Sequence, residues 1–234
     1  MNLLSKYVEF LGIRTENEIE NAVSNFLPNG SNIKYLDCGC DNGIKTINRA
    51  RTIRTSKIWG IESINARAKV ARKNNLSVYI SNLNRKFPIK SNLLDCITAT
   101  EVVEHLSDVD NFLSECKRVL KKGGSVIIST ENLAGWQNIF SLVLGNQPYT
   151  GPYLSKVFSA VARPSGKFYK HPLPMDPHLN VMTLKALIRL LKLYGFNNIE
   201  SVGVGFMPFP YPFSSGLSWL DKYHSTYIVV KAIK

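Results

Sequence analysis

Short apolar runs alternate along the chain with segments in which apolar residues recur every three or four positions. The runs have the length and composition of buried strands, and the periodic segments have the spacing of helices that bury one face. The pattern predicts strands over residues 33–38, 57–61, 76–80, 96–99, 125–130, 199–205 and 226–232. It predicts helices over residues 43–54, 64–73, 112–120 and 184–195. Because strands that alternate with helices in this way pair in parallel within one sheet, we expect an α/β fold with a doubly wound sheet.

Three segments fall outside this alternation. Residues 1–28 carry apolar residues at helical spacing and predict one or two N-terminal helices that end near a Pro-Asn-Gly break. Residues 132–180 are rich in proline, glycine and aromatic residues without an evident strand, which predicts an inserted cap or lid. Residues 207–213 contain three prolines and predict an irregular loop. We therefore expect one domain over residues 1–234 that carries a cap at one edge.

Composition adds one strong asymmetry to this picture. The 234 residues are 44% apolar and 20% charged, which excludes a disordered chain, and the net charge is +12. Residues 45–90 hold twelve Lys or Arg and a single acid, Glu62. A basic block of this kind indicates either an anionic partner such as nucleic acid or a solvated face. Because most of it falls on predicted helices that flank the sheet, we expect mainly a solvated face.

Three features of the sequence indicate the cellular compartment. The first residues lack the apolar core of a signal peptide, and the longest apolar run is far too short to span a bilayer. Four cysteines occur without a C-x-x-C pair, so neither a zinc site nor a disulfide scaffold is indicated. We therefore expect a cytoplasmic protein without a transmembrane segment. The oligomeric state is left open by these features.

A glycine-rich turn follows the first predicted strand. It runs Asp37-Cys38-Gly39-Cys40-Asp41-Asn42-Gly43, and a helix begins directly after it. Such a turn lets a ligand approach the backbone at the point where the strand order of a doubly wound sheet reverses. At the end of the second strand stands Glu62, which can accept hydrogen bonds from both hydroxyls of a ribose. The spacing differs from the G-x-G-x-x-G of dinucleotide sites, so a different nucleoside ligand is indicated.

The turn resembles the first motif of class I S-adenosylmethionine-dependent methyltransferases, with Asp41 in place of the middle glycine. Segments 81–88, 94–100 and 112–130 also resemble that superfamily in order and spacing. The resemblance implies a Rossmann-like, seven-stranded sheet and S-adenosylmethionine as cofactor. Asn82 stands where the superfamily usually has an Asp that contacts the adenine amine. The cofactor-binding residues that the resemblance implies are Asp37, Cys38, Gly39, Gly43, Glu62, Ser63, Asn82, Leu83 and Thr100.

A short acidic element follows the fourth predicted strand. Glu101-Val102-Val103-Glu104-His105 resembles the Glu-x-x-Glu-His element of ubiquinone-biosynthesis O-methyltransferases and of small-RNA 2′-O-methyltransferases. The resemblance implies that His105, Glu101 and Glu104 lie at the methyl acceptor as catalytic residues. In those families the element binds a divalent cation, and a later histidine comparable to His178 takes part in the small-RNA enzymes. We expect no metal here, and keep Glu101, Glu104, His105 and His178 as the alternative metal-ligating set.

The predicted cap supplies the remaining candidates. Its Asn-Leu-Ala-Gly-Trp stretch, 132–136, resembles a motif of uncharacterised methyltransferases presumed to act on sugars, lipids or other small metabolites. Trp136 and His178 are therefore candidates for substrate or lid contacts; alternatively, Trp136 packs the cap onto the body, or the stretch lies on a membrane surface. The expected activity is methyl transfer to an O or N atom of a small molecule, a saccharide or a lipid precursor. The alternative is an RNA methyltransferase of the 2′-O type, assisted by a metal.

Overall fold

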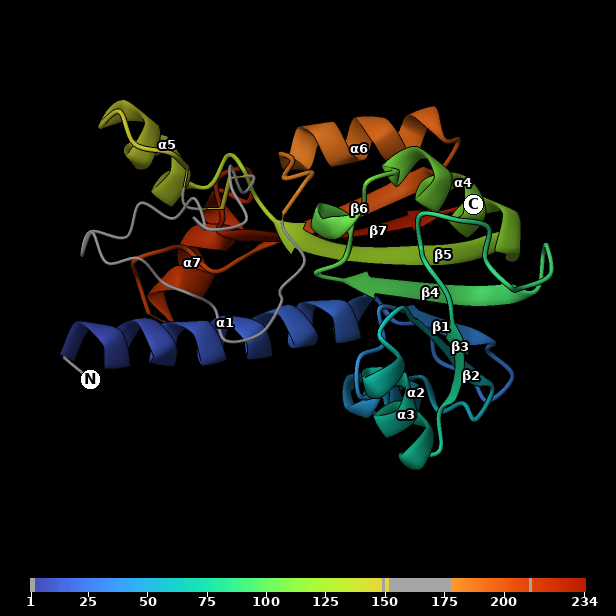
Figure 1. The fold of residues 1–234 in the computed structure, drawn as a ribbon. Helices are drawn as coiled ribbons and strands as arrows, with labels where there is room; N and C mark the ends of the chain where they lie inside the picture. Colours follow the sequence, from blue (N-terminus) through green and yellow to red (C-terminus); the bar gives the residue numbers. More distant parts are fainter. Residues whose placement is uncertain (1–2, 149, 152–177, 211) are drawn as a thin grey trace.

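The computed structural model describes residues 3–148, 150–151, 178–210 and 212–234, with side chains from residue 14 onward. Within these ranges, seven strands form one sheet in the order β3-β2-β1-β4-β5-β7-β6 (Figure 1). Strands β1 to β5 run parallel, and β7 lies antiparallel to both β5 and β6. The strands are β1 (Tyr35–Cys38), β2 (Ile58–Glu62), β3 (Ser77–Ile80), β4 (Leu94–Thr100), β5 (Leu120–Glu131), β6 (Asn197–Val204) and β7 (Tyr227–Ile233). The predicted doubly wound sheet is confirmed, and its order reverses between β1 and β4.

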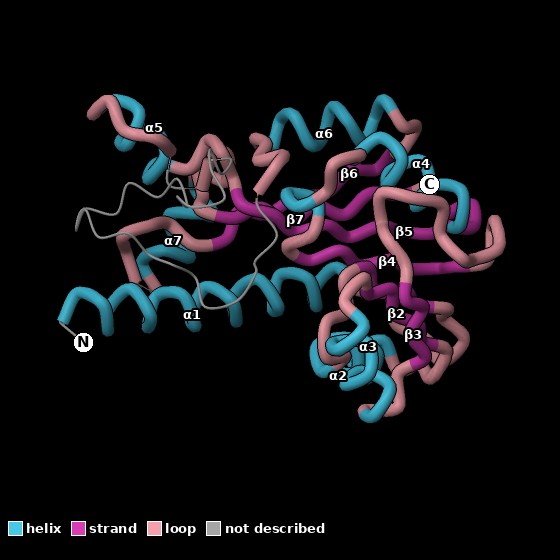
Figure 2. Tube along the Cα trace, in the orientation of Figure 1, coloured by secondary structure: helices cyan, strands magenta, loops and turns pink. Residues whose placement is uncertain are grey.

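Helices cover both faces of the sheet, as Figures 1 and 2 show. On one face α4 and α6 pack against alternate residues of the central strands, such as Leu36 and Ile97. On the other face α1 and α2 pack against the intervening residues, such as Tyr35 and Cys96. This division follows from the two-residue period of a strand, because successive side chains point to opposite faces. The helices are α1 (Leu3–Phe26), α2 (Ile44–Ile53), α3 (Asn65–Lys73), α4 (Val109–Val119), α5 (Trp136–Val143), α6 (Leu184–Leu193) and α7 (Phe213–Leu220).

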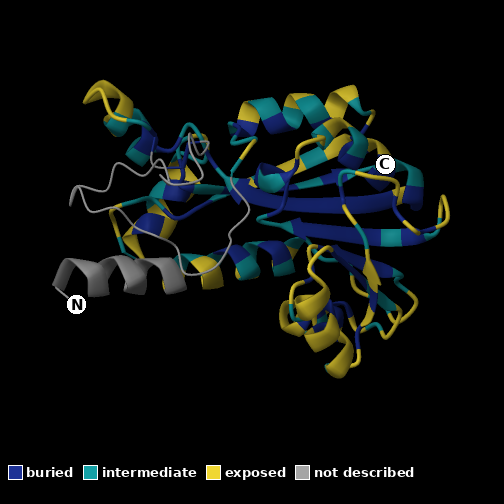
Figure 3. Ribbon diagram, viewed as in Figure 1, coloured by how far each residue is buried: buried dark blue, intermediate teal, exposed yellow. Residues whose placement is uncertain are grey.

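Burial explains why the strands could be predicted from apolar runs. The four residues of β1 are all buried, and most of β4 and β5 is buried too (Figure 3). Parallel strands that are covered on both faces read as nearly continuous apolar stretches rather than as an alternation. Exposed residues lie on the outer surfaces of α2 and α3, and these surfaces carry six of the twelve cations of the basic block.

Two details differ from the sequence expectation, whereas the one or two helices expected over residues 1–28 are present as one, α1. β5 begins at Leu120 rather than at 125, and its register against β4 shifts between Leu94 and Cys96, which lets the strand continue through two glycines. A further helix, α7, follows directly after the loop expected over 207–213.

The cap and the domain division remain predictions. Of the segment 132–180, the structure describes 132–148, 150–151 and 178–180, and the rest lies outside the described residues. The described part contains α5, which lies beside α7 at one end of the molecule. None of the helices in the described ranges is long and apolar enough to cross a membrane.

Candidate functional site

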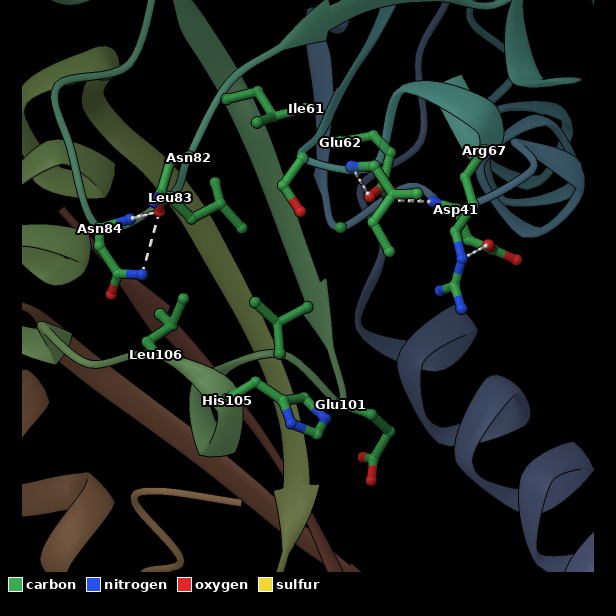
Figure 4. A pocket seen from close by; sticks show the side chains of 14 residues that line it. Asp41, Ile61, Glu62, Arg67, Asn82, Leu83, Asn84, Glu101, His105 and Leu106 are labelled. Atoms are coloured by element: carbon green, nitrogen blue, oxygen red, sulfur yellow. Dashed lines mark hydrogen bonds and ion pairs between the residues drawn. The ribbon is translucent and has the colours of Figure 1, made fainter. Parts of the chain in front are cut away.

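A cavity of about 440 Å³ opens at the carboxyl ends of β1, β2 and β4 (Figure 4). Ligands of doubly wound sheets bind at this edge, where the strand order reverses. Half of the residues predicted for cofactor and acceptor line this one cavity, although they come from four different stretches of the chain. These residues are Gly39, Glu62, Ser63, Asn82, Leu83, Glu101 and His105.

The glycine turn forms the floor of the cavity. Gly39 has φ 76°, and a Cβ atom placed there would lie 2.7 Å from Cγ2 of Val102. Glycine is therefore required at this position for two reasons: the positive φ angle, and the close approach of Val102 just after the neighbouring strand β4. Gly43, with φ 81°, opens α2, and a Cβ there would press on Ala71 of α3 at 3.1 Å. Gly43 does not line the cavity, so its part is to let the two helices pack closely.

Glu62 at the end of β2 is held by the backbone on both sides. Its Oε2 accepts a hydrogen bond from the Asp41 amide at 3.0 Å, and its Oε1 accepts one from the Ile64 amide at 2.8 Å. The residue is only 6% exposed, and it lines the cavity. A carboxylate has about four lone-pair positions, so each oxygen keeps the capacity to accept a further hydrogen bond. The arrangement suits a ligand with two neighbouring hydroxyl groups.

Asp37 supports this turn from beneath and does not line the cavity. Its carboxylate lies 3.1 Å from Nη1 of Arg49 on α2, and accepts hydrogen bonds from the hydroxyls of Thr46 and Thr98. Arg49 also binds Glu20 of α1 at 2.6 Å. Burial raises the pKa of Asp37, and the guanidinium and the two hydroxyls offset only part of that effect. Asp37 thus ties β1 to α1 and α2, and the buried Cys38 beside it likewise lies within the core.

The network also changes the interpretation of the basic block. Arg49 is one of its twelve cations, yet it is only 3% exposed and is paired with two acids. Arg67 is another, and it lines the cavity next to Asp41. The expectation of a solvated face therefore fails for Arg49, which tertiary contacts draw into the core, whereas Arg67 stays half-exposed at the rim of the cavity.

The apolar wall of the cavity combines three parts of the chain. Leu83 follows β3, Ile61 belongs to β2, and Leu106 follows the turn after β4. The side-chain oxygen of Asn82 accepts a hydrogen bond from the Asn84 amide at 2.8 Å, and Asn84 in turn accepts from the Asp108 amide at the start of α4. This chain of hydrogen bonds fixes the loop. An apolar slot with amide groups at its edge can hold a flat heterocycle such as adenine.

A cluster of acids follows β4, where the backbone takes an unusual turn. Glu101 lines the cavity with φ 53°, a left-handed conformation that is a genuine outlier for this residue type. Its Oε1 accepts a hydrogen bond from the Ser129 hydroxyl at 2.8 Å. Burial raises the pKa of Glu101 well above its usual range, and the neighbouring Glu104 adds to the rise. Burial likewise raises the pKa of Glu104 to about 7, although Thr130 donates a hydrogen bond to it.

His178 joins this cluster although it is more than 70 positions away from His105 in the sequence. The backbone oxygen of Glu104 accepts hydrogen bonds from the amides of Leu179 and Asn180, at 2.6 and 3.0 Å. The His178 ring packs edge-on to His105, with ring centres 4.9 Å apart, and its Nδ1 lies 2.9 Å from Oε2 of Glu131. Burial opposes the charged form of His178, but Glu131 and Glu101 outweigh it and raise the pKa.

Side-chain geometry partly supports the alternative metal-ligating set. Among the described residues, ligand atoms of Glu104, His105 and His178 all lie within 4.8 Å of one another. Val103–His105 forms a single 3-10 turn, and Glu101 accepts a hydrogen bond from Ser129 instead of joining these three residues. Two imidazoles and a carboxylate are a donor set that suits divalent transition metals. The residues present therefore fit a cation with three protein ligands, without Glu101.

Two predicted residues lie elsewhere. Thr100 does not line the cavity, and its hydroxyl is buried without a hydrogen-bond partner in the described part of the chain. Trp136 donates from its indole N–H to Asp221 at 3.3 Å and packs its ring near Phe140 and His224. Trp136 thus anchors α5 to the segment before β7, as the packing alternative expects. A contact with substrate stays a prediction for this residue.

The sequence pattern missed several cavity residues. Asp41, Arg67, Asn84 and Leu106 all line it without having been singled out for that purpose. Arg67 could have been suspected, because it lies in the first turn of the helix that follows Glu62. The others depend on loop conformation, for which short-range spacing carries no signal.

Comparison with known proteins identifies the family. Residues 11–201 match the model of a family described as a methyltransferase domain. The chain belongs to this methyltransferase domain family. The domain is 27% identical over 126 residues to the mitochondrial ubiquinone biosynthesis O-methyltransferase of Rattus norvegicus. This match covers 50% of this chain and 36% of the relative. It is 29% identical over 133 residues to the ubiquinone biosynthesis O-methyltransferase of Pelagibacter ubique, covering 53% and 55%. The chain thus spans about half the length of such curated relatives, or less.

Solved structures share the fold of this methyltransferase domain. An S-adenosylmethionine-dependent methyltransferase from Thermotoga maritima superposes with TM-score 0.64 at 18% identity, covering 99% of this chain and 96% of that one. A Listeria monocytogenes protein of the same description gives TM-score 0.65 at 17% identity, covering 95% and 99%. The Haemonchus contortus phosphoethanolamine N-methyltransferase 2, solved with S-adenosyl-L-methionine, gives TM-score 0.59 at 16% identity, covering 92% and 52%. The fold is therefore that of the class I methyltransferases.

Proposed function

We propose that the protein transfers a methyl group from S-adenosylmethionine to an oxygen or nitrogen atom of a small molecule. The observation that carries the proposal is the conformation of Glu62. Its carboxylate is fixed by two backbone amides, faces the cavity and stands beside the glycine turn at the switch point of the sheet. The two carboxylate oxygens of Glu62 are held rigidly at this place, and both can accept hydrogen bonds from the two hydroxyls of a ribose.

The other walls of the cavity fit the remaining parts of the cofactor. Ile61, Leu83 and Leu106 would contact the adenine ring, with Asn82 at its edge. Gly39 lets the ligand approach the backbone where a Cβ would collide. S-adenosylmethionine, when bound, supplies a methyl group on a positively charged sulfur, which is a strong electrophile. The protein's contribution is then to bind, to orient the acceptor and to exclude water.

His105, Glu101 and Glu104 are proposed as the residues at the methyl acceptor. His105 and Glu101 line the cavity, and Glu104 lies behind them with a pKa of about 7, so its carboxyl can gain or lose a proton near neutral pH. An imidazole can take the proton that a hydroxyl acceptor loses as its oxygen attacks the methyl group.

A hydroxyl group on a small molecule is the favoured acceptor. The curated relatives are named for O-methylation in ubiquinone biosynthesis, which supports an oxygen acceptor on a small molecule. Charge at the site agrees with this proposal. Among the described residues that line the cavity, Arg67 is the single one with a permanent positive charge, which is few for a site that binds a phosphate backbone.

An RNA acceptor with metal assistance is the second candidate. It is favoured by the proximity of Glu104, His105 and His178, which could hold a divalent cation near a ribose hydroxyl. With a cation in place, these three residues would act as ligands rather than as proton acceptors. The two candidates therefore differ in their response to a chelating agent and to RNA.

Calorimetry with S-adenosylmethionine tests the cofactor assignment. Glu62→Gln keeps the size of the side chain but removes the charge, and we expect it to weaken binding about 10- to 100-fold, the effect of losing a hydrogen bond to a charged group. Glu200→Gln, at an exposed acid on β6, is the matched control and should bind as the unchanged protein does. Equal affinity of the Glu62→Gln variant and the unchanged protein would refute the assignment. Transfer of a labelled methyl group to a mixture of phenols or to total RNA then separates the two acceptor classes.

A further inference from the structure

An ion pair at the rim of the cavity suggests a role in cofactor retention. We propose that Asp41 and Arg67 form a latch that closes the ribose side of the cavity and slows the dissociation of the cofactor. The inference rests on the proposed function, because it takes S-adenosylmethionine as the ligand. It concerns positioning residues, since neither side chain is assigned to the reacting atoms.

The pair joins the two elements that flank Glu62. Asp41 belongs to the turn between β1 and α2, and Arg67 lies in the first turn of α3. Nε of Arg67 lies 3.4 Å from Oδ1 of Asp41, and both residues line the cavity (Figure 4). Their side chains are 46% and 52% exposed, so the pair lies at the boundary between cavity and solvent. A ligand bound at Glu62 therefore has this pair beside it.

The backbone conformation of Asp41 is one that favours glycine, so the presence of a charged side chain there needs an explanation. Asp41 has φ 47°, in the left-handed region that glycine adopts without strain. The superfamily motif that this turn resembles has glycine at this position, so the turn itself does not require a carboxylate. Asp tolerates the conformation better than most residues, but it still pays for it relative to glycine. A function of the charged side chain explains why an acid is found here.

The same residue also sets the orientation of Glu62. The Asp41 amide donates the hydrogen bond to Oε2 of Glu62, so any movement of the turn is transmitted to that carboxylate. The guanidinium of Arg67 contacts the side chain of Asp41, so it places a positive charge at the rim of the cavity that Glu62 also lines. When a ligand displaces water from the cavity, the attraction between Asp41 and Arg67 strengthens, because the local dielectric constant falls.

The test uses substitutions that remove charge and keep the conformation. Asp41→Asn retains a residue that tolerates the left-handed region, and Arg67→Gln retains a polar side chain on α3. Lys69→Gln, at an exposed lysine of the same helix outside the cavity, is the matched control. The two ligands used are S-adenosylmethionine and S-adenosylhomocysteine, which share the ribose and differ in the charge on sulfur. Dissociation rates come from stopped-flow displacement, affinities from calorimetry, and thermal midpoints from circular dichroism.

We expect each single substitution to speed dissociation of both ligands by a factor of about 3 to 5, as for a half-exposed ion pair. The double substitution should do no more than either single one, because both remove the same interaction. The difference from the unchanged protein should shrink when salt is raised from about 0.05 M to about 0.5 M. Thermal midpoints should stay within about 2 °C, and Arg67→Lys should recover part of the slower rate.

Several results would overturn the latch. These are unchanged dissociation rates in both single variants, additive effects in the double variant, an equal effect of Lys69→Gln, or an effect confined to S-adenosylmethionine. The last result would assign the pair to recognition of the charged sulfur instead. Failure of the proposed function has a different pattern, since the unchanged protein would then bind neither ligand and Glu62→Gln would change nothing.

Discussion

The buried ion pair beneath the glycine turn supplies the sharpest prediction about stability. Arg49 is 3% exposed and contacts Asp37 at 3.1 Å and Glu20 at 2.6 Å. Arg49→Met replaces the guanidinium with a side chain of comparable reach and no charge. Glu20 can turn toward solvent, because its side chain is 24% exposed, but Asp37 stays buried with two hydroxyl donors as its remaining partners.

Breaking a buried pair by removing one partner costs about 3–5 kcal/mol, because an uncompensated charge is left in the interior. For a protein of this size each kcal/mol lowers the thermal midpoint by roughly 2–4 °C, so a drop of about 10 °C is expected near neutral pH. Burial already raises the pKa of Asp37, and the loss of Arg49 raises it further. A carboxyl whose pKa is higher in the folded than in the unfolded state binds extra protons when folded. Its stabilising contribution is full below the unfolded pKa of about 3.9 and is lost as pH rises through the folded value. The deficit of Arg49→Met should therefore be small at about pH 4 and full above about pH 7.

Urea unfolding followed by circular dichroism, at several pH values, measures this deficit. Arg51→Met is the matched control on the same helix, because Arg51 is exposed. Among the described residues, its side chain donates a hydrogen bond to the side chain of Asn48. The double variant Asp37→Asn with Arg49→Met removes the buried charge and should recover part of the lost stability. A deficit below about 1 kcal/mol at neutral pH, or one that is independent of pH and unrelieved by Asp37→Asn, would refute the reasoning.

Three further predictions follow from the site. Gly39→Ala places a Cβ 2.7 Å from a valine methyl at φ 76°, so it should cost about 2 kcal/mol in urea unfolding and weaken cofactor binding in calorimetry. Gly216→Ala, inside α7 with nothing within 4 Å of the added Cβ, should leave binding unchanged and should not lower stability. Glu104 has a pKa of about 7 in the fold against an ordinary value of 4.5, so its contribution to stability is full below the lower value and is lost as pH rises through the higher one. Glu104→Gln should therefore raise the thermal midpoint above about pH 7 and leave it unchanged at about pH 4, and a midpoint lowered at both would contradict this cause. If His105 takes the proton without a cation, methyl transfer should persist in a chelating agent, and loss of activity that a divalent cation restores would instead favour the metal-assisted candidate.

Much of the fold could be predicted because the decisive patterns are local. Parallel strands covered on both faces must be apolar along their whole length, so β1, β4 and β5 stand out as runs. Helix α7 escaped prediction for the opposite reason. Its apolar residues Phe213, Trp219 and Leu220 are exposed, so no buried face imposes a helical period on the sequence.

The candidate site divides in the same way. The glycine turn and Glu62 belong to single βα connections, where a residue's role follows from its position just after a strand. The assignments that failed or shifted depend on contacts between distant segments. Asp37 was expected at the ligand, but Arg49 and two hydroxyls hold it below the turn. The alternative metal-ligating set placed Glu101 with Glu104, His105 and His178, but Glu101 accepts a hydrogen bond from Ser129 and is not among the three residues whose ligand atoms lie close together.

The sequence by itself determined the α/β architecture, the glycine turn and the acid at the end of β2, because strand burial and turn conformation restrict residue type locally. Only the tertiary structure decided which charges are compensated. It placed Arg49 in the core, brought Arg67 to Asp41 at the rim of the cavity and set His178 against His105. Charge–charge energies depend on distance and on burial, and neither quantity is a function of spacing along the chain.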